Sequence, residues 1–176
     1  MKSILVFSNG EKIGDGIIKL PLLNEIKRRL PNYRLYWMTD HGNTVYTTIL
    51  KEIASKFIYK CFEKADFNYF FSGRISNKFD LEKENFDIIL DTQKSVFRTL
   101  TLKKIKHNTF ISGAASGFFS DIKLPKLIKN QKKYYLENLY DLLDLIEKRE
   151  VDKNFNFPIN QNIEEILKKI FKKYYK

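Results

Sequence analysis

An aspartate stands between two glycines near the start of the chain, Asp15 between Gly14 and Gly16. It follows an apolar run at 4–7 that predicts a buried strand, and it precedes a periodic apolar stretch that predicts a helix over 16–30. In open α/β sheets, ligands bind outside the carboxyl ends of the strands, where such a strand–helix turn lies. A carboxylate placed there can act as a general base if it reaches a substrate hydroxyl.

The local sequence leaves a second role open for Asp15. An aspartate at this turn can simply cap the following helix, because its side chain accepts hydrogen bonds from the first free amides. The flanking glycines allow close backbone approach or unusual dihedral angles, which fits either role. The spacing of Gly10, Gly14 and Gly16 is not that of a dinucleotide fingerprint, and no Walker A lysine pattern occurs. A nucleotide at this first turn is therefore poorly supported.

A second group of polar residues follows the predicted strand 86–91, namely Asp91, Gln93, Lys94 and Arg98. Because the carboxyl ends of parallel strands share one edge of a sheet, we expect these side chains to share a crevice with Asp15. Lysine and arginine there suit an anionic ligand, and arginine can grip a carboxylate or phosphate with two hydrogen bonds. The alternative is an ordinary solvated helix face, with Asp91 as the acid near its N-terminus.

Strand and helix patterns alternate along the chain and predict a Rossmann-like α/β fold, a parallel sheet flanked by helices. The helix over 16–30 should turn an apolar stripe inward, with Lys19, Lys27, Arg28 and Arg29 mostly outside it. The segment 63–82 shows no clean period and is assigned loop and short helix. The expected strands are 2–7, 34–39, 56–62, 86–91 and 107–112, and the expected helices are 16–30, 44–55, 95–105, 131–147 and 162–176.

Length and composition favour one folded domain. At 176 residues, 43% apolar and 15% aromatic, the chain is long and apolar enough to bury a core. No apolar run approaches the roughly 20 residues that span a bilayer, and no secretory signal is visible. The single cysteine, Cys61, cannot form an internal disulfide, which fits a reducing cytoplasm. We expect residues 1–150 to form the domain and 151–176 to form a linker and a terminal amphipathic helix.

The net charge of +11 is uneven, with 14 basic and 11 acidic side chains in residues 1–90 against 18 and 10 in residues 91–176. Such an excess favours polyanions, so nucleic acid, an anionic membrane face and a phosphorylated glycolipid are all candidate partners. AT-rich coding bias explains the lysines equally well. The basic terminal helix suits an anionic membrane or docking on the domain. No RNA-binding signature and no metal-ligand spacing occur, so we expect no metal and give nucleic acid little weight.

Two motifs together resemble family 9 glycosyltransferases, the bacterial heptosyltransferase group that builds the lipopolysaccharide core. The first is IGDGIIKLPLL at 13–23, between an apolar strand and a strand containing Trp37. The second is FDIILDTQ at 86–93, which is followed by a helix carrying the basic Arg98. The likeness extends over residues 1 to about 160.

This resemblance implies a GT-B enzyme with two Rossmann-like domains, of which this chain is the N-terminal, acceptor-binding half. Asp15 would be the base of an inverting transfer without metal or covalent intermediate. The candidate acceptor-binding residues are Lys12, which takes the place of a small hydroxyl residue, and Gly14, Gly16, Asp91, Gln93 and Arg98.

The resemblance also implies the partners. The acceptor would be an anionic glycolipid or polysaccharide, and the nucleotide-sugar donor would be a substrate bound by a second domain absent from this chain, which alone should not catalyse transfer. We expect a cytoplasmic protein, with peripheral association at the inner membrane face. The alternative is a non-catalytic basic α/β module that holds an anionic glycolipid, a membrane surface or a partner subunit.

Overall fold

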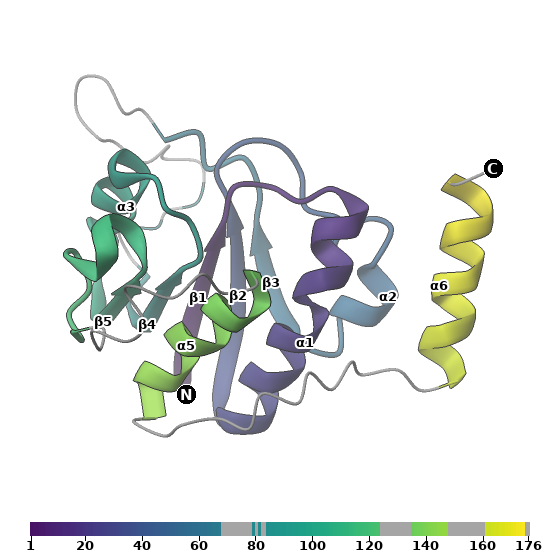
Figure 1. The fold of residues 1–176 in the computed structure, drawn as a ribbon, viewed down its shortest axis with the longest axis horizontal. Coiled ribbons are helices and arrows are strands. Elements are labelled where there is room, and N and C mark those ends of the chain that lie inside the picture. Colours follow the sequence, from purple (N-terminus) through teal and green to yellow (C-terminus); the bar gives the residue numbers. More distant parts are fainter. Residues whose placement is uncertain (68–78, 80, 82–83, 124–134, 148–160, 175–176) are drawn as a thin grey trace.

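The computed structural model describes residues 1–67, 79, 81, 84–123, 135–147 and 161–174. Its described part contains a parallel five-stranded sheet in the order β3-β2-β1-β4-β5 (Figure 1). The order reverses between β1 and β4, and ligands of doubly wound sheets bind at the carboxyl side of such a switch point. The strands are β1 Lys2–Ser8, β2 Tyr33–Thr39, β3 Ile58–Phe62, β4 Phe86–Asp91 and β5 His107–Ser112.

Helices cover both faces of the sheet. Residues of α1 and α5 share a core with one face, and α3 contributes to the core on the other face, so the α/β fold class expected from the sequence is confirmed. Figure 1 shows α1 and α5 lying together across one face of the sheet. The helices are α1 Ile13–Arg29, α2 Lys51–Ala54, α3 Val96–Leu102, the 3₁₀ turn η2 Ala114–Gly117, α5 Tyr135–Glu147 and α6 Gln161–Tyr174.

The central strand explains why the apolar runs are unbroken. In β1, Ile4 and Val6 enter the core beneath α1 and α5, whereas Leu5 and Phe7 enter the opposite core, and all four side chains are fully buried. Alternate residues of a strand point to opposite faces, so a sheet covered on both sides needs apolar residues at every position.

Several element boundaries differ from the sequence prediction. The helix α1 begins at Ile13, three residues before the predicted start, so Asp15 lies inside its first turn. The predicted helix 44–55 is wrong over most of its length: residues 45–50 form turns, one of them closed by a hydrogen bond from the Leu50 amide to the Val45 carbonyl. Most of 63–82, together with 131–134 and 148–160, lies outside the described residues.

Two basic residues of α1 are buried, which contradicts the expectation that they lie outside the apolar stripe. Lys19 is 4% exposed and Arg29 is 9% exposed. Arg29 donates to Glu25 and to Asp144 of α5, at 2.6 and 2.8 Å. The charge of Arg29 is thus paired at the contact between the two helices, where an unpaired cation would be costly.

The terminal helix α6 docks on the domain through a short apolar contact. Ile166 is buried in the core shared with α1, and Leu167 packs against that core. Lys168, Lys169 and Lys172 remain exposed. Of the roles that the sequence leaves open for this helix, docking on its own domain is the one that the structure describes.

Gly16 is the point at which α1 approaches the 45–50 turn most closely. A Cβ atom added there would lie 2.3 Å from Val45 Cγ2 and 3.1 Å from Leu50 Cδ1. The Tyr46 hydroxyl donates to the Gly16 carbonyl at 2.8 Å. Gly14, in contrast, would meet nothing within 4 Å, and neither glycine has a positive φ. Close approach therefore explains Gly16, and unusual dihedral angles explain neither glycine.

We predict that Gly16→Ala destabilises the fold by about 1–3 kcal/mol, because overpacking a fixed core contact costs that much. Val45→Ala should recover much of this loss in the double variant, since it removes the clashing methyl groups. The matched control is Gly14→Ala, which should be stabilising by up to about 1 kcal/mol as an exposed glycine-to-alanine change in a helix. Urea unfolding measures all four proteins, and equal effects at the two glycines would contradict the packing role.

Candidate functional site

The candidate base Asp15 is exposed at the carboxyl edge of the sheet. It is the third residue of α1, whose N-cap is Lys12, and no side-chain hydrogen bond caps that N-terminus. No hydrogen bond joins the Asp15 carboxylate to another described residue. The capping role is thus reduced to a favourable charge in the first helical turn, and the carboxylate is open to a solute. Lys12 and Gly14 are exposed beside it.

A buried polar network lies behind this turn, centred on the carboxylate of Glu11. The Trp37 indole donates to Glu11 Oε1 at 3.1 Å, and the Thr44 hydroxyl donates to Oε2 at 2.7 Å. The ammonium of Lys19 contacts Oε1 at 3.4 Å. The network therefore ties the residue before Lys12 to the second strand and to the loop that follows it.

Lys19 completes the network from the second turn of α1. Its ammonium donates to the Ser8 hydroxyl at 2.7 Å and lies 5.8 and 5.9 Å from the ring centres of Trp37 and Tyr135. Burial lowers the pKa of Lys19, although the nearby Glu11 and Asp15 charges oppose that shift. The desolvated cation is held by one carboxylate, one hydroxyl and two aromatic faces, which fixes the start of α1.

The spacing of Lys19 from apolar positions of α1 indicates that its side chain is buried, although a lysine is usually expected at the surface. Lys19 lies three residues after Gly16 and four before Leu23, both of which are buried on α1. That spacing places it on the buried stripe. Glu11 had no such signal, because it precedes the helix.

We predict that Lys19→Met costs about 3–5 kcal/mol of stability at pH 7, because it leaves the buried Glu11 carboxylate without its cation. The double variant Glu11→Gln/Lys19→Met should be more stable than Lys19→Met alone, since it buries no charge. Lys27→Met, at an exposed position of the same helix, serves as control and should change stability by less than about 0.5 kcal/mol. Urea unfolding of the complete cycle gives the coupling energy, and additive single effects would rule out the pairing.

Asp91 lies at the end of β4, where it is fully buried and bonded inside the protein. Its Oδ2 accepts hydrogen bonds from Thr99 of α3 at 2.6 Å and from Ser112 of β5 at 2.8 Å. Its Oδ1 accepts from the Gln93 amide at 2.9 Å. Burial raises the pKa of Asp91 to about 6, and the three hydrogen bonds oppose the shift. The carboxylate joins two strands and a helix behind the surface.

We predict that Asp91 makes the stability of the protein fall as pH rises from about 4 to about 6. The unfolded carboxyl ionises near 3.8 and the folded one near 6, so the folded protein holds the extra proton over that interval. Two pKa units correspond to about 2–3 kcal/mol. Asp91→Asn abolishes the titration and can keep the hydrogen bonds if the Thr99 and Ser112 hydroxyls rotate. Its stability relative to wild type should therefore rise by that amount over the interval.

Urea unfolding between pH 4 and pH 7 tests this prediction. The matched control is Glu52→Gln, at an exposed acid that forms no ion pair with a described residue, and its profile should lack the rise expected of Asp91→Asn. A parallel profile for Asp91→Asn would show that the buried carboxyl does not titrate in this range.

The remaining predicted residues lie along the loop and helix after β4. Gln93 is half-buried, and its side-chain Nε2 donates to the Thr92 hydroxyl at 3.2 Å. Lys94 is exposed. Arg98 donates through Nε to the buried Asp40, after β2, at 2.9 Å. Arg98 thereby links the loop after β2 to α3, a role that its spacing in the sequence did not reveal.

Tyr135 at the start of α5 contacts both α1 and the loop that follows β4. Besides its contact with Lys19, its hydroxyl is hydrogen-bonded to Thr92, and burial raises the pKa of Tyr135 to about 12. Thr92 in turn donates to the Phe7 carbonyl of β1 at 2.7 Å. Since β1 and β4 are neighbours at the switch point of the sheet, the first turn of α1 and the 92–95 loop border the same crevice position.

No group of three or more histidine, cysteine or acidic side chains is placed to hold a metal ion in the described part of the chain. Among its helices, none has the length and apolar content needed to cross a membrane.

The fold resembles that of solved glycosyltransferase structures. The chain superposes on the E. coli heptosyltransferase WaaC with ADP at a TM-score of 0.56, with 15% identity over 90% of this chain and 49% of that one. It superposes on a family 9 glycosyltransferase from Veillonella parvula at a TM-score of 0.53, with 13% identity over 99% of this chain and 50% of that one. No family model matches the sequence, and no curated protein matches it significantly.

The resemblance stated from the sequence is thus confirmed at the level of the fold. A second structure of WaaC, with ADP-2-deoxy-2-fluoro heptose, gives a TM-score of 0.51 at 15% identity. The chain spans about half the length of each of these glycosyltransferases. It has the Rossmann-like domain architecture of GT-B glycosyltransferases.

Proposed function

We propose that this chain is the acceptor-binding half of an inverting glycosyltransferase, acting on a lipopolysaccharide-core or other envelope glycan, with Asp15 as the catalytic base. The observation that carries the proposal is the open Asp15 carboxylate in the first turn of α1, beside the switch point of a sheet shared with heptosyltransferases. A base must be able to reach the proton it removes, and an exposed carboxylate without a hydrogen-bonding partner among the described residues meets that need.

The proposed reaction is a single displacement. The acceptor hydroxyl gives its proton to Asp15 while its oxygen forms a bond to the anomeric carbon of the donor sugar. The bond from that carbon to the nucleoside diphosphate breaks, and the diphosphate leaves with the electron pair. The network of Glu11 and Lys19 supports this step by fixing the turn on which Asp15 is carried, since small misplacements of a base are costly.

The acceptor would lie over the exposed part of the edge. Lys12 and Gly14 flank Asp15, and Gln93 and Arg98 follow β4 at the neighbouring strand end. A glycan carrying phosphate or carboxylate groups suits the two cations. Gly16 and Asp91, both buried, would act from behind this surface by holding α1 and the 92–95 loop in place.

The donor would be a nucleotide sugar held largely by a second domain. WaaC is described with ADP and with an ADP-linked heptose analogue, and this chain spans about half of that protein. We place the transfer at the cytoplasmic face of the inner membrane, where peripheral association would bring the acceptor glycolipid within reach. Inversion needs neither a metal nor a covalent intermediate.

The test is complementation of a deletion of the coding gene in its own host. Deletion should shorten an envelope glycan, seen as faster migration of the glycolipid on a gel, and the wild-type gene should restore its length. Asp15→Asn should fail to restore it, because loss of a general base lowers the rate by about 10²–10⁴-fold. The stability of the variant should fall by no more than about 1 kcal/mol, the usual contribution of an acidic side chain in the first helical turn.

The matched control is Glu52→Gln, which neutralises an exposed acid in the first turn of α2. It should restore the glycan fully. Restoration by Asp15→Asn at equal protein level would exclude the base role, and an unchanged glycan in the deletion strain would exclude the envelope acceptor.

A further inference from the structure

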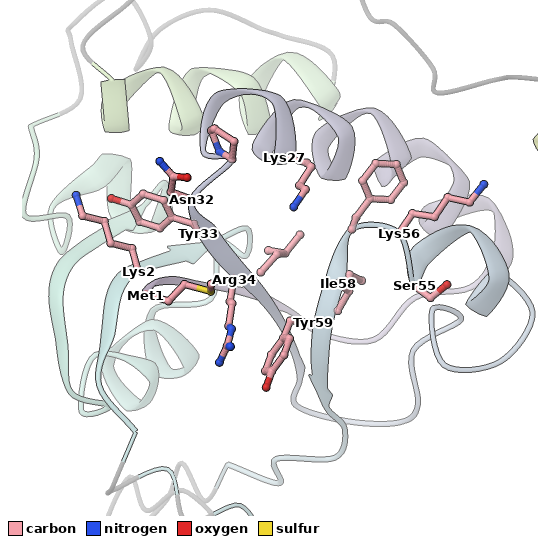
Figure 2. Close-up of a pocket in the computed structure, with 13 residues that line it drawn as sticks. Met1, Lys2, Lys27, Asn32, Tyr33, Arg34, Ser55, Lys56, Ile58 and Tyr59 are labelled. Carbon is pink, nitrogen blue, oxygen red and sulfur yellow. The ribbon is translucent and has the colours of Figure 1, made fainter.

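A separate pocket of about 710 Å³ opens at the amino ends of β1, β2 and β3 (Figure 2). It lies at the opposite edge of the sheet from Asp15, and the seven residues of β1 put roughly 20 Å between the two edges. Its volume is that of a small-molecule site. None of the residues assigned to the glycosyltransferase site lines it.

The wall of this pocket is strongly cationic. Its lining includes Lys2, Lys27, Arg34 and Lys56, and none of its thirteen residues is acidic. None of these four cations forms an ion pair with a described residue. Some basic side chains elsewhere are paired with a carboxylate, as Arg28 is with Glu25 and Lys103 with Asp121. Four cations without a carboxylate partner in the described part of the chain therefore line one pocket.

Aromatic rings hold two of these cations in place. The Arg34 guanidinium lies 4.5 Å from the ring centre of Tyr59, and the Lys2 ammonium lies 5.5 Å from that of Tyr33. Figure 2 shows Arg34 and Tyr59 side by side next to the strands, with Lys27 projecting from α1 above them. The Arg34 guanidinium is also hydrogen-bonded to the Tyr36 side chain. Because both contacts hold the guanidinium in place, it loses less entropy when its other N–H groups bind an anion.

We infer that this pocket binds a phosphate-bearing ligand. Four cations that line one concavity and have no carboxylate partner among the described residues suit a ligand with more than one negative charge. The guanidinium fork matches the oxygens of a phosphate group. The lysines supply point charges around it. A phosphorylated solute and a phospholipid headgroup share this chemistry. The inference does not depend on the proposed transferase activity, because it rests on the other edge of the sheet.

The experiment uses the whole chain at low salt with two probes. Calorimetry measures binding of inorganic pyrophosphate, and co-sedimentation measures binding to vesicles of phosphatidylcholine alone or mixed with phosphatidylglycerol. Lys27→Gln/Arg34→Gln should weaken the probe that binds by about tenfold or more, because each charge-assisted hydrogen bond is worth roughly 1.5–3 kcal/mol and 1.4 kcal/mol is tenfold in affinity. If the wild type binds pyrophosphate but not the vesicles, the ligand is a phosphorylated solute. If the wild type binds phosphatidylglycerol vesicles and the double variant does not, the ligand is a phospholipid headgroup.

The matched control is Lys169→Gln/Lys172→Gln, which removes the same charge from the exposed face of α6 and should change affinity less than twofold. Asp15→Asn should leave binding unchanged, which separates this result from the fate of the transferase proposal. Amide resonances of residues 33–35 and 56–59 should shift on titration, and unfolding temperatures check the variants. Equal weakening by the two double variants would overturn the inference, as would no binding of either probe.

Discussion

The buried pair of Glu11 and Lys19 is the interaction on which the candidate site depends. It places two opposite charges beneath the turn that joins the central strand to α1, and tryptophan, threonine and serine partners satisfy both ends. A buried pair is a weak source of net stability, but breaking one side is costly. It therefore acts as a constraint on geometry: the start of α1 has one position, and Asp15 is carried on it.

The two edges of the sheet divide the polar groups differently. At the carboxyl edge, buried charges are paired or hydrogen-bonded, as Asp40 is with Arg98 and Asp91 with two hydroxyl groups, and Asp15 is left open to solvent. At the amino edge, the four cations that line the pocket have no carboxylate partners among the described residues. Part of the net charge of +11 is thus gathered around one pocket at the amino edge. Composition alone could not show this, because coding bias also explains a high lysine content.

The sequence predicted what local patterns determine. The sequence predicted β4 and β5 with their observed bounds, and the alternation of elements predicted the parallel sheet. It did not predict the burial of Lys19, because a charged residue on an apolar stripe is counted as surface unless its distant partners are known. The internal role of Asp91 depends on Ser112, which only strand pairing brings close.

The most direct measurement is a structure of this chain with the envelope glycan that accumulates when its gene is deleted. The account predicts that an acceptor hydroxyl lies within hydrogen-bond reach of the Asp15 carboxylate, at about 2.6–3.2 Å, with the rest of the glycan over Lys12 and the 92–95 loop. A glycan bound with its reactive hydroxyl away from Asp15, or bound only at the amino edge of the sheet, would contradict it.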